Sequence, residues 1–242
     1  MTRRPFPRTP RAGSPRRTWR VLALTVAAIA ALSVGVAVSS AAPSPAAAPV
    51  FPPNAHPFGT TLAKWSAAWW QFNLAIPAAP PATDPDENHC GPSGVDDSVQ
   101  FLLFNPGGNW KCDLPRGSAL FLPVLNVECS SVEAPPFFGG NPGKQRQCTR
   151  EFMDDAEDIA ASIDGVAVPN IPAHRVRSPQ FSFGPLPLLN WLGVPDRPSG
   201  TAVSDGVYLM IKPLSAGTHD VVLHGEFPGI FVLDSTITVT VS

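Results

Sequence analysis

GTTLAKWSAAWWQFNLAI, residues 59–76, is the stretch that decides the expected fold. Its apolar side chains recur at the 100° spacing of an α-helix and form one stripe: Leu62, Trp65, Trp69, Phe72 and Ile76. Thr60 or Thr61 can cap the N-terminus of this helix, and Pro77 ends the pattern. The sequence therefore predicts a helix with a core-facing stripe.

A second apolar side of the same helix lies opposite that stripe. Its members are Ala63, Ala67, Trp70 and Leu74. Such a helix is either buried between two layers, or it offers its second side to a partner or ligand. We expect burial, because each tryptophan removes roughly 150–250 Å² from water. Trp70 should then be buried, and Gln71, on a polar seam, should form a hydrogen bond with a loop.

The first 41 residues are predicted to be a secretory signal peptide. Residues 1–20 carry seven arginines and no acid, residues 21–38 are apolar or small, and small residues follow as a cleavage site. Arg16 and Arg17 loosely resemble a twin-arginine signal, although Pro15 stands where Ser or Thr is expected. An uncleaved membrane anchor is the alternative, because this apolar run is just long enough to span a bilayer.

The rest of the chain is divided into a leader and a domain. Residues 42–57 are rich in Pro and Ala and are predicted to be disordered, and residues 58–242 should form a single β-rich domain. The chain has 17 basic and 19 acidic residues, so removing seven arginines leaves 10 against 19, a net charge near −9. This excess of acid argues against binding nucleic acid. We also expect no membrane contact beyond the export signal.

The four cysteines all follow the signal: Cys90, Cys112, Cys129 and Cys148. An even number in an exported chain indicates two disulfides. Of the three possible pairings we expect the sequential one, which closes two moderate loops and stabilises by roughly 3 kcal/mol per loop on the chain-entropy model. The sequence has no C-x-x-C motif and no Cys and His residues at the spacing of metal ligands, so we expect neither a metal site nor a cofactor.

Short β patterns with turn residues between them dominate the domain. Residues 119–127 are predicted to form a central strand, in which Pro123 implies a bulge. Further strands are expected at residues 98–104, 176–183, 206–212, 218–224 and 230–241. The pattern as a whole predicts a mainly β domain, an antiparallel β-sandwich or jelly-roll-like fold with two packed α-helices and two disulfides.

The second of these helices is expected at residues 149–162, after a Pro/Gly loop at residues 135–143. Thr149 can cap it, and its inward stripe includes Phe152 and Ile159. Its other side is acidic: Asp154, Asp155, Glu157 and Asp158. Paired acids are compatible with metal or acid–base chemistry, but a solvated helical face is the expected role.

Five stretches of the chain resemble a family of exported bacterial proteins to which no activity is assigned. They lie at residues 59–72, 114–129, 163–170, 175–183 and 205–219 and span most of the domain. The Trp-Trp-Gln helix motif and the Pro-Val-Leu-Asn-x-Glu-Cys strand motif are its markers, and Phe72 stands where another Trp is expected. The resemblance implies an exported, disulfide-bonded, β-rich domain, and it carries over no catalytic residue.

Five residues are candidates for a binding site: Trp70, Gln71, Asn126, Glu128 and His219. Asn126 and Glu128 alternate onto one side of a strand, where Glu128 either contacts a ligand, acts as a general acid or accepts hydrogen bonds from loop amides. His219 follows a Leu-Ser-Ala-Gly-Thr turn, where holding a loop is the expected role. Motifs of common enzymes, such as G-x-S-x-G, H-E-x-x-H and the P-loop, do not occur in the sequence.

These observations favour a non-catalytic module that is secreted or held in the cell envelope. Its partner would be an unknown ligand or an envelope component. The alternative is a hydrolase-like enzyme that acts on an envelope or extracellular polymer through Glu128 and a histidine. Convergence of Glu128, His219 and Trp70 on one cleft would favour the enzyme, and their dispersal would favour the binding module.

Overall fold

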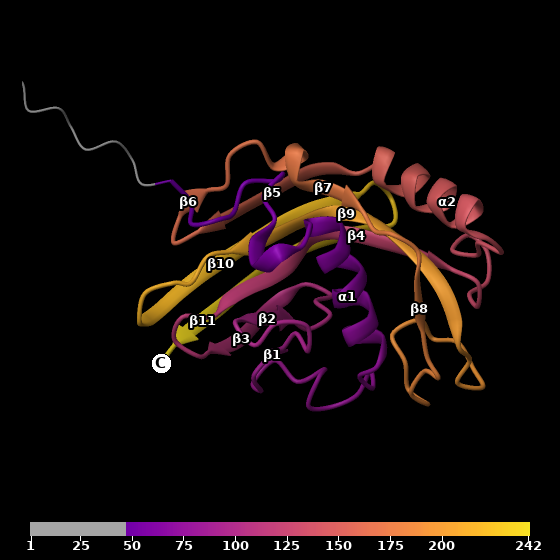
Figure 1. Ribbon diagram of the computed structural model, residues 1–242, viewed down its shortest axis with the longest axis horizontal. Helices are drawn as coiled ribbons and strands as arrows, with labels where there is room; N and C mark the ends of the chain where they lie inside the picture. The colour runs from indigo at the N-terminus through magenta and orange to yellow at the C-terminus, as the bar shows by residue number, and fades with distance from the viewer. Residues whose placement is uncertain (1–46) are drawn as a thin grey trace, which may run out of the picture. The chain divides into compact units, whose positions relative to one another are not determined.

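The computed structural model describes residues 47–242, in which two β-sheets pack face to face and helices lie outside them (Figure 1). The predicted signal peptide and the first part of the predicted leader lie outside the described residues. From Pro49 onward the leader is ordered along a central strand, because the Phe51 amide donates to the Met210 carbonyl at 2.9 Å and the Lys212 amide donates to that of Pro49 at 2.7 Å. The predicted disorder is therefore wrong for residues 49–57.

The first sheet has six strands, ordered β1-β2-β4-β9-β7 with β8 beside β9. Their bounds are Cys90–Pro92 (β1), Val99–Leu102 (β2), Ala119–Ser130 (β4), Arg175–Arg177 (β7), Phe181–Phe183 (β8) and Gly200–Ile211 (β9). β2 runs parallel to β4, and the other pairs are antiparallel. The predicted irregularity at Pro123 is confirmed, because the register of β4 against β9 shifts between Pro123 and Leu125.

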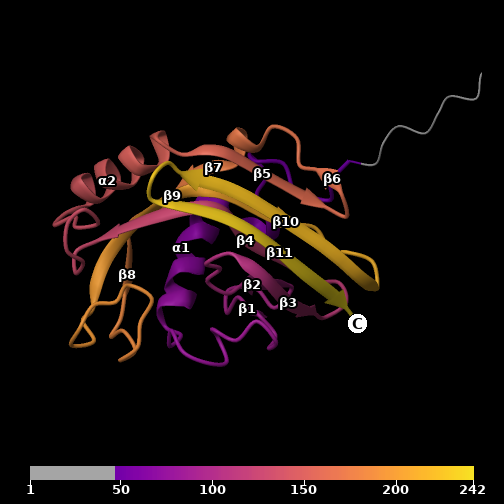
Figure 2. The same ribbon diagram turned by 180° about the vertical axis from the view of Figure 1, so that it is seen from behind.

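The second sheet has five strands, ordered β3-β11-β10-β5-β6. Their bounds are Gly108–Leu114 (β3), Glu157–Ile163 (β5), Val166–Ala167 (β6), Gly217–Phe227 (β10) and Phe231–Val241 (β11). Figure 2 shows β10 and β11 in front, joined by a tight turn beside α2 (Pro142–Asp154). Alternate residues of β11, Ile237 and Val239, are fully buried against the first sheet, as the alternation of the sequence predicted. The mainly β fold with two packed sheets is thus confirmed.

Helix α1 (Leu62–Leu74) covers the outer face of the first sheet and creates a second apolar core there. Trp65, Trp69 and Trp70 are each at most 4% exposed, so the burial predicted for both sides of the helix is confirmed. Each indole nitrogen also has an acceptor: Pro57 O at 3.1 Å, Leu102 O at 2.6 Å and the Tyr208 hydroxyl at 3.1 Å. The tryptophans therefore fix the position of α1 through directional hydrogen bonds as well as through apolar contact.

Two short 3₁₀ helices complete the helical elements among the described residues, η1 (Pro57–Gly59) and η2 (Ile171–His174). α1 begins at Leu62 because the Thr61 hydroxyl accepts a hydrogen bond from the Lys64 amide at 3.3 Å. On its polar seam, the Gln71 amide donates to the Ser182 carbonyl at 2.9 Å. Gln71 thus contacts strand β8 rather than the loop that we expected.

The helix predicted at residues 149–162 is wrong in its position. α2 begins earlier, at Pro142, because the Asn141 side chain caps the Lys144 amide at 3.0 Å and proline suits the first turn of a helix. It ends at Asp154, and residues 157–163 form strand β5, in which Ala161 and Ile163 alternate inward. The spacing of apolar residues in this short run fits the periodicity of a strand as well as that of a helix, and hydrogen bonding with β10 stabilises the strand.

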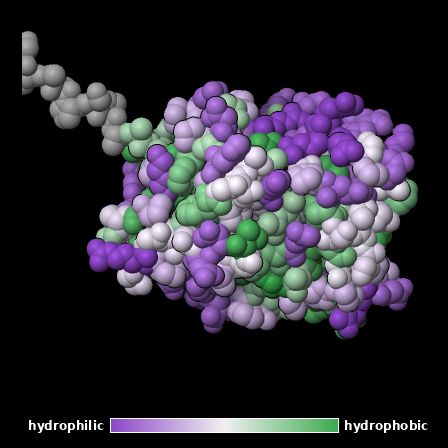
Figure 3. Space-filling view, viewed as in Figure 1, coloured by the Kyte–Doolittle hydropathy of each residue, from purple (hydrophilic) through white to green (hydrophobic). Residues whose placement is uncertain are grey.

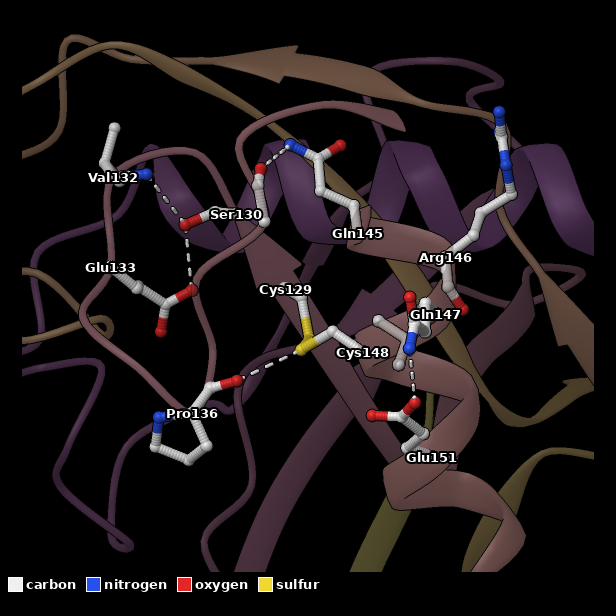
Figure 4. Close-up of a disulfide and its surroundings, with 12 residues drawn as sticks. Cys129, Ser130, Val132, Glu133, Pro136, Gln145, Arg146, Gln147, Cys148 and Glu151 are labelled. Carbon is white, nitrogen blue, oxygen red and sulfur yellow. Dashed lines mark hydrogen bonds between the residues drawn. A yellow bond between two sulfur atoms is a disulfide. The ribbon is translucent and has the colours of Figure 1, made fainter. Parts of the chain in front are cut away.

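Both predicted disulfides are present. Cys90–Cys112 joins β1 of the first sheet to β3 of the second, and Cys129–Cys148 joins β4 to α2 (Figure 4). The outward side of α2 is hydrophilic (Figure 3). Disulfides of this kind indicate an oxidising compartment. Within residues 47–242, the helices are too short or too polar to span a bilayer.

Replacing Trp69 should strongly destabilise the domain. Trp69→Ala removes a side chain that is 1% exposed and leaves the Leu102 carbonyl without its donor, so we expect a loss of about 3–5 kcal/mol in the free energy of unfolding. Phe138→Ala, which removes a half-exposed ring, should cost less than about 1 kcal/mol. Urea unfolding followed by circular dichroism measures both, and equal midpoints for the two variants would contradict the second core.

Candidate functional site

A pocket of about 300 Å³ opens beside β4 at the point where β2 has ended. β2 pairs only with residues 119–121 of β4, and the next pairing on this edge is the bridge between Ser130 and Phe138, so the edge is unpaired between Phe121 and Ser130. Residues 123–128 of β4 line the pocket, and the β10–β11 hairpin closes one side through Phe227 and Phe231. The pocket therefore lies at an exposed end of the contact between the two sheets.

Aromatic rings form the opposite wall. α1 contributes Trp69 and Trp70, and two loops contribute Phe104 and Trp191. The ring of Phe104 stacks on that of Trp191 with centroids 4.9 Å apart, and Trp69 and Trp70 meet edge to face at 5.2 Å. Because these rings hold one another in place, the wall is formed before any ligand enters.

Two carboxyl groups lie at the end of this pocket. Glu128 is 4% exposed, its Oε2 has no hydrogen-bond partner, and its carboxyl forms a hydrogen bond with that of Glu133. Glu133 also accepts a hydrogen bond from the Ser130 hydroxyl at 2.8 Å (Figure 4). A buried polar oxygen without a partner is rare in folded proteins, so Glu128 is the strongest sign of a site in the described chain.

The surroundings of the two carboxyls favour a proton held between them. Burial raises the pKa of Glu128 well above its usual value, and the hydrogen bond and charge of Glu133 raise it further. Burial also raises the pKa of Glu133, although hydrogen bonds from Glu128 and Ser130 oppose the shift. A hydrogen bond between two carboxyls needs one proton, so the pair carries about one negative charge while that proton is held.

Basic side chains are not among the residues that line the pocket within residues 47–242. The guanidinium groups of Arg175 and Arg177, on β7 of the same sheet, are bound to Asp205, each at 2.9 Å. The side chain of Asp205 is 1% exposed, so its buried charge is neutralised by these two arginines. The negative charge of the carboxyl pair consequently has no cation opposite it in the pocket.

Three of the five predicted site residues meet here. Trp70, Asn126 and Glu128 line the same pocket, and the Tyr208 hydroxyl accepts the hydrogen bond that orients Trp70. The close approach of β9 to Asn126 of β4 requires Gly206, because a Cβ at that position would collide with the Cβ of Asn126. Phe104 and Trp191 carried no site signal in the sequence, since each lies in a loop that only the tertiary fold brings to β4. Glu133 lies in the turn directly after β4, and no sequence motif singled it out.

The other two predicted residues lie elsewhere. Gln71 is on the exposed side of α1, and His219 lies on β10, outside the pocket. His219 Nδ1 is 2.7 Å from Asp164 Oδ2, and its Nε2 is 3.0 Å from the Ser215 carbonyl and 3.3 Å from the Ser215 hydroxyl. The order Ser-His-Asp has the appearance of a catalytic triad, but a carbonyl oxygen competes for the nitrogen that would act as the base.

A protonated His219 side chain explains these contacts better than a catalytic role does, because both ring nitrogens face acceptor oxygens. The hydrogen bond to Asp164 raises the pKa of His219, and the Ser215 carbonyl raises it further. The protonated ring donates from both nitrogens and has no lone pair left to accept a proton from a serine. His219 therefore holds the turn between β9 and β10, the structural role that its position after the Leu-Ser-Ala-Gly-Thr turn favoured. Elsewhere in residues 47–242, no group of three His, Cys, Asp or Glu side chains is placed to hold a metal ion.

A second, larger hollow of about 710 Å³ lies between α2 and the β10–β11 turn. Its charged lining residues are exposed, and two of them already have partners: Glu151 accepts from Gln147 at 2.8 Å, and Asp154 pairs with Arg175 at 2.8 Å. Buried unpartnered groups such as Glu128 are not among its lining within the described chain. The smaller pocket is therefore the candidate site.

His219 should make the stability of the domain depend on pH. Because its pKa is raised in the folded state, the stabilisation is fully present below the pKa of an unfolded histidine and is lost as pH rises through the folded value. We expect the urea midpoint to fall between about pH 5.5 and about pH 8.5, and to fall less in His219→Gln. Asp164→Asn should reduce the fall in the same way, and an undiminished fall in both variants would contradict this role.

Comparisons with known proteins give little beyond this geometry. No protein-family model and no curated protein matches the sequence. Among solved structures, the solution structure of amebosin matches at 10% identity, over 60% of this chain and 97% of amebosin, with a TM-score of 0.21. A TM-score this low supports no conclusion about fold or function, so the candidate site stands on its own geometry.

Proposed function

We propose that this chain is an exported binding protein that holds a small organic ligand in the pocket beside β4. The observation that carries the proposal is the unpartnered Oε2 of Glu128, buried at the end of a pocket with aromatic walls. Binding sites for small molecules combine such apolar walls with a few buried polar groups that orient the ligand. A ligand that donates to Glu128 would remove the cost of leaving this oxygen unpaired.

Binding accounts for the site better than hydrolysis through Glu128 and a histidine. His219 lies outside the pocket, and the lining residues within residues 47–242 include neither histidine nor a serine or cysteine nucleophile. The hydrogen-bonded contact between Glu128 and Glu133 also leaves no space for a scissile glycosidic bond between them.

One observation favours a catalytic second candidate. Two carboxyls that share a proton are the acid–base pair of some hydrolases. Cleavage of a peptide by the wild-type protein, abolished in Glu128→Gln with binding retained, would establish that alternative.

Export is part of the proposal and has two supports. The N-terminal sequence has the basic, apolar and small-residue segments of a secretory signal. The disulfides Cys90–Cys112 and Cys129–Cys148 persist in oxidising compartments such as the cell exterior and the envelope. The resemblance to exported bacterial proteins agrees with both. A ligand for this pocket would accordingly be a soluble extracellular molecule or a part of the envelope.

A neutral fluorescent probe tests the pocket independently of its charge preference. N-phenyl-1-naphthylamine emits strongly only in an apolar site, and we expect saturable binding of one molecule per chain. Trp191→Ala removes one ring of the stacked wall and should weaken this binding about tenfold. Leu188→Ala changes an exposed side chain of the same loop and should leave the affinity unchanged. Absence of saturable binding, or equal affinity in both variants, would overturn the proposed pocket.

A further inference from the structure

We infer that the pocket beside β4 selects an organic cation, an ammonium group with small apolar substituents, whose charge the Glu128–Glu133 pair neutralises. The inference rests on the proposed function and names the class of its ligand. Three features of the pocket carry it: a pair of carboxyls without a counterion, an aromatic lining, and a proton that a cation can displace.

The charge is the first feature. Glu128 and Glu133 lie together at the pocket, and the described lining residues offer no basic side chain to either of them. Glu128 Oε2 also lacks any hydrogen-bond partner within the fold. Burying carboxyl groups without a cation or a full set of hydrogen bonds opposes their ionisation. A ligand that brings a positive charge offsets this opposition, whereas an anionic ligand would increase it.

The aromatic wall is the second feature. The indole nitrogens of Trp69 and Trp70 donate outward, to the Leu102 carbonyl and the Tyr208 hydroxyl, so these rings meet the pocket with their carbon atoms. Ring faces attract cations, and an ammonium group that bears methyl groups also gains from their apolar contact. Trp191, whose ring stacks on that of Phe104, lines the same pocket.

The shared proton is the third feature. While the pair holds it, the pocket has about one negative charge, and a bound cation favours the form with two. Binding therefore releases a proton to solvent: the cation and the protonated pair become the cation, the fully ionised pair and a free proton. The affinity for a cation should rise with pH as this proton becomes easier to remove.

Other ionisable groups near the pair leave this expectation unchanged. On β9, burial raises the pKa of Tyr208, which keeps its hydroxyl neutral, and Asp205 is held by Arg175 and Arg177. On η2, burial lowers the pKa of His174, which favours its neutral imidazole. The carboxyl pair is thus the group beside the pocket whose proton a cation can displace.

The test compares choline with 3,3-dimethyl-1-butanol, which has the same shape and hydroxyl but no charge. Calorimetry on the full domain, and displacement of N-phenyl-1-naphthylamine, give both affinities. We expect choline to bind at least about tenfold more tightly, and more tightly at about pH 8.5 than at about pH 5.5. Calorimetry in two buffers of different ionisation enthalpy should show proton release with choline and none with the neutral alcohol.

Two variants assign the preference to the pair. Glu128→Gln should remove the preference for choline and the proton release, while binding of the neutral probe persists. Glu151→Gln changes the net charge by the same amount on the exposed side of α2, outside this pocket, and should preserve both. If Glu128→Gln fails to fold, the two ligands still decide the question on the wild-type protein.

The outcomes separate this inference from the proposed function. If the neutral alcohol binds as tightly as choline, or if choline binds without releasing a proton, the inference of a cation site is wrong while probe binding still supports the pocket. If neither the probe nor choline binds, the proposed function fails together with the inference. A preference for choline that disappears in Glu128→Gln and persists in Glu151→Gln would support both.

Discussion

The burial of the three tryptophans of α1 against the first sheet is the interaction on which the rest of the structure depends. α1 gives the first sheet a second apolar core on its outer face, so β4 and β9 are covered on both sides. Each indole also donates a hydrogen bond to a different part of the chain, which fixes the helix relative to β9, the end of β2 and the segment before α1. A helix held in this way is a rigid support, and the aromatic wall of the pocket is built on it.

The pocket itself follows from an interruption in β4. β2 ends at Leu102, so β4 has no paired neighbour on that side between Phe121 and Ser130, where Phe138 bridges it. The bulge between Pro123 and Leu125 changes which side chains face α1. Asn126 and Glu128 therefore meet the tryptophans instead of the space between the sheets. The chain after β4 turns back at Ser130 and brings Glu133 to Glu128. A regular strand would have filled this volume with apolar side chains.

Much of the fold could be predicted from the sequence, because it depends on local patterns. α1, the disulfides, the bulge at Pro123 and the C-terminal strands follow from periodicity, cysteine count and turn chemistry. α2 and β5 could not be placed, since one short apolar run matches both periods and its pairing with β10 is a long-range contact. Of the candidate site, alternation along β4 predicted that Asn126 and Glu128 share one side. Glu133 reaches them from the turn directly after β4, and Trp191 from a distant loop, a contact that no local pattern records.

The unpaired edge of β4 also bears on how the protein behaves at high concentration. An exposed strand edge is a template for pairing with another chain, and proteins commonly protect such edges with proline, bulges or bulky cover. The Ala119 amide donates to Ser98 on the β2 side, and alternation gives Pro123 the same orientation at the position where β2 is absent. Proline has no amide hydrogen to offer there, and the β10–β11 hairpin covers the next residues. The protein can thus keep this edge open to a small molecule and still resist aggregation through intermolecular strand pairing.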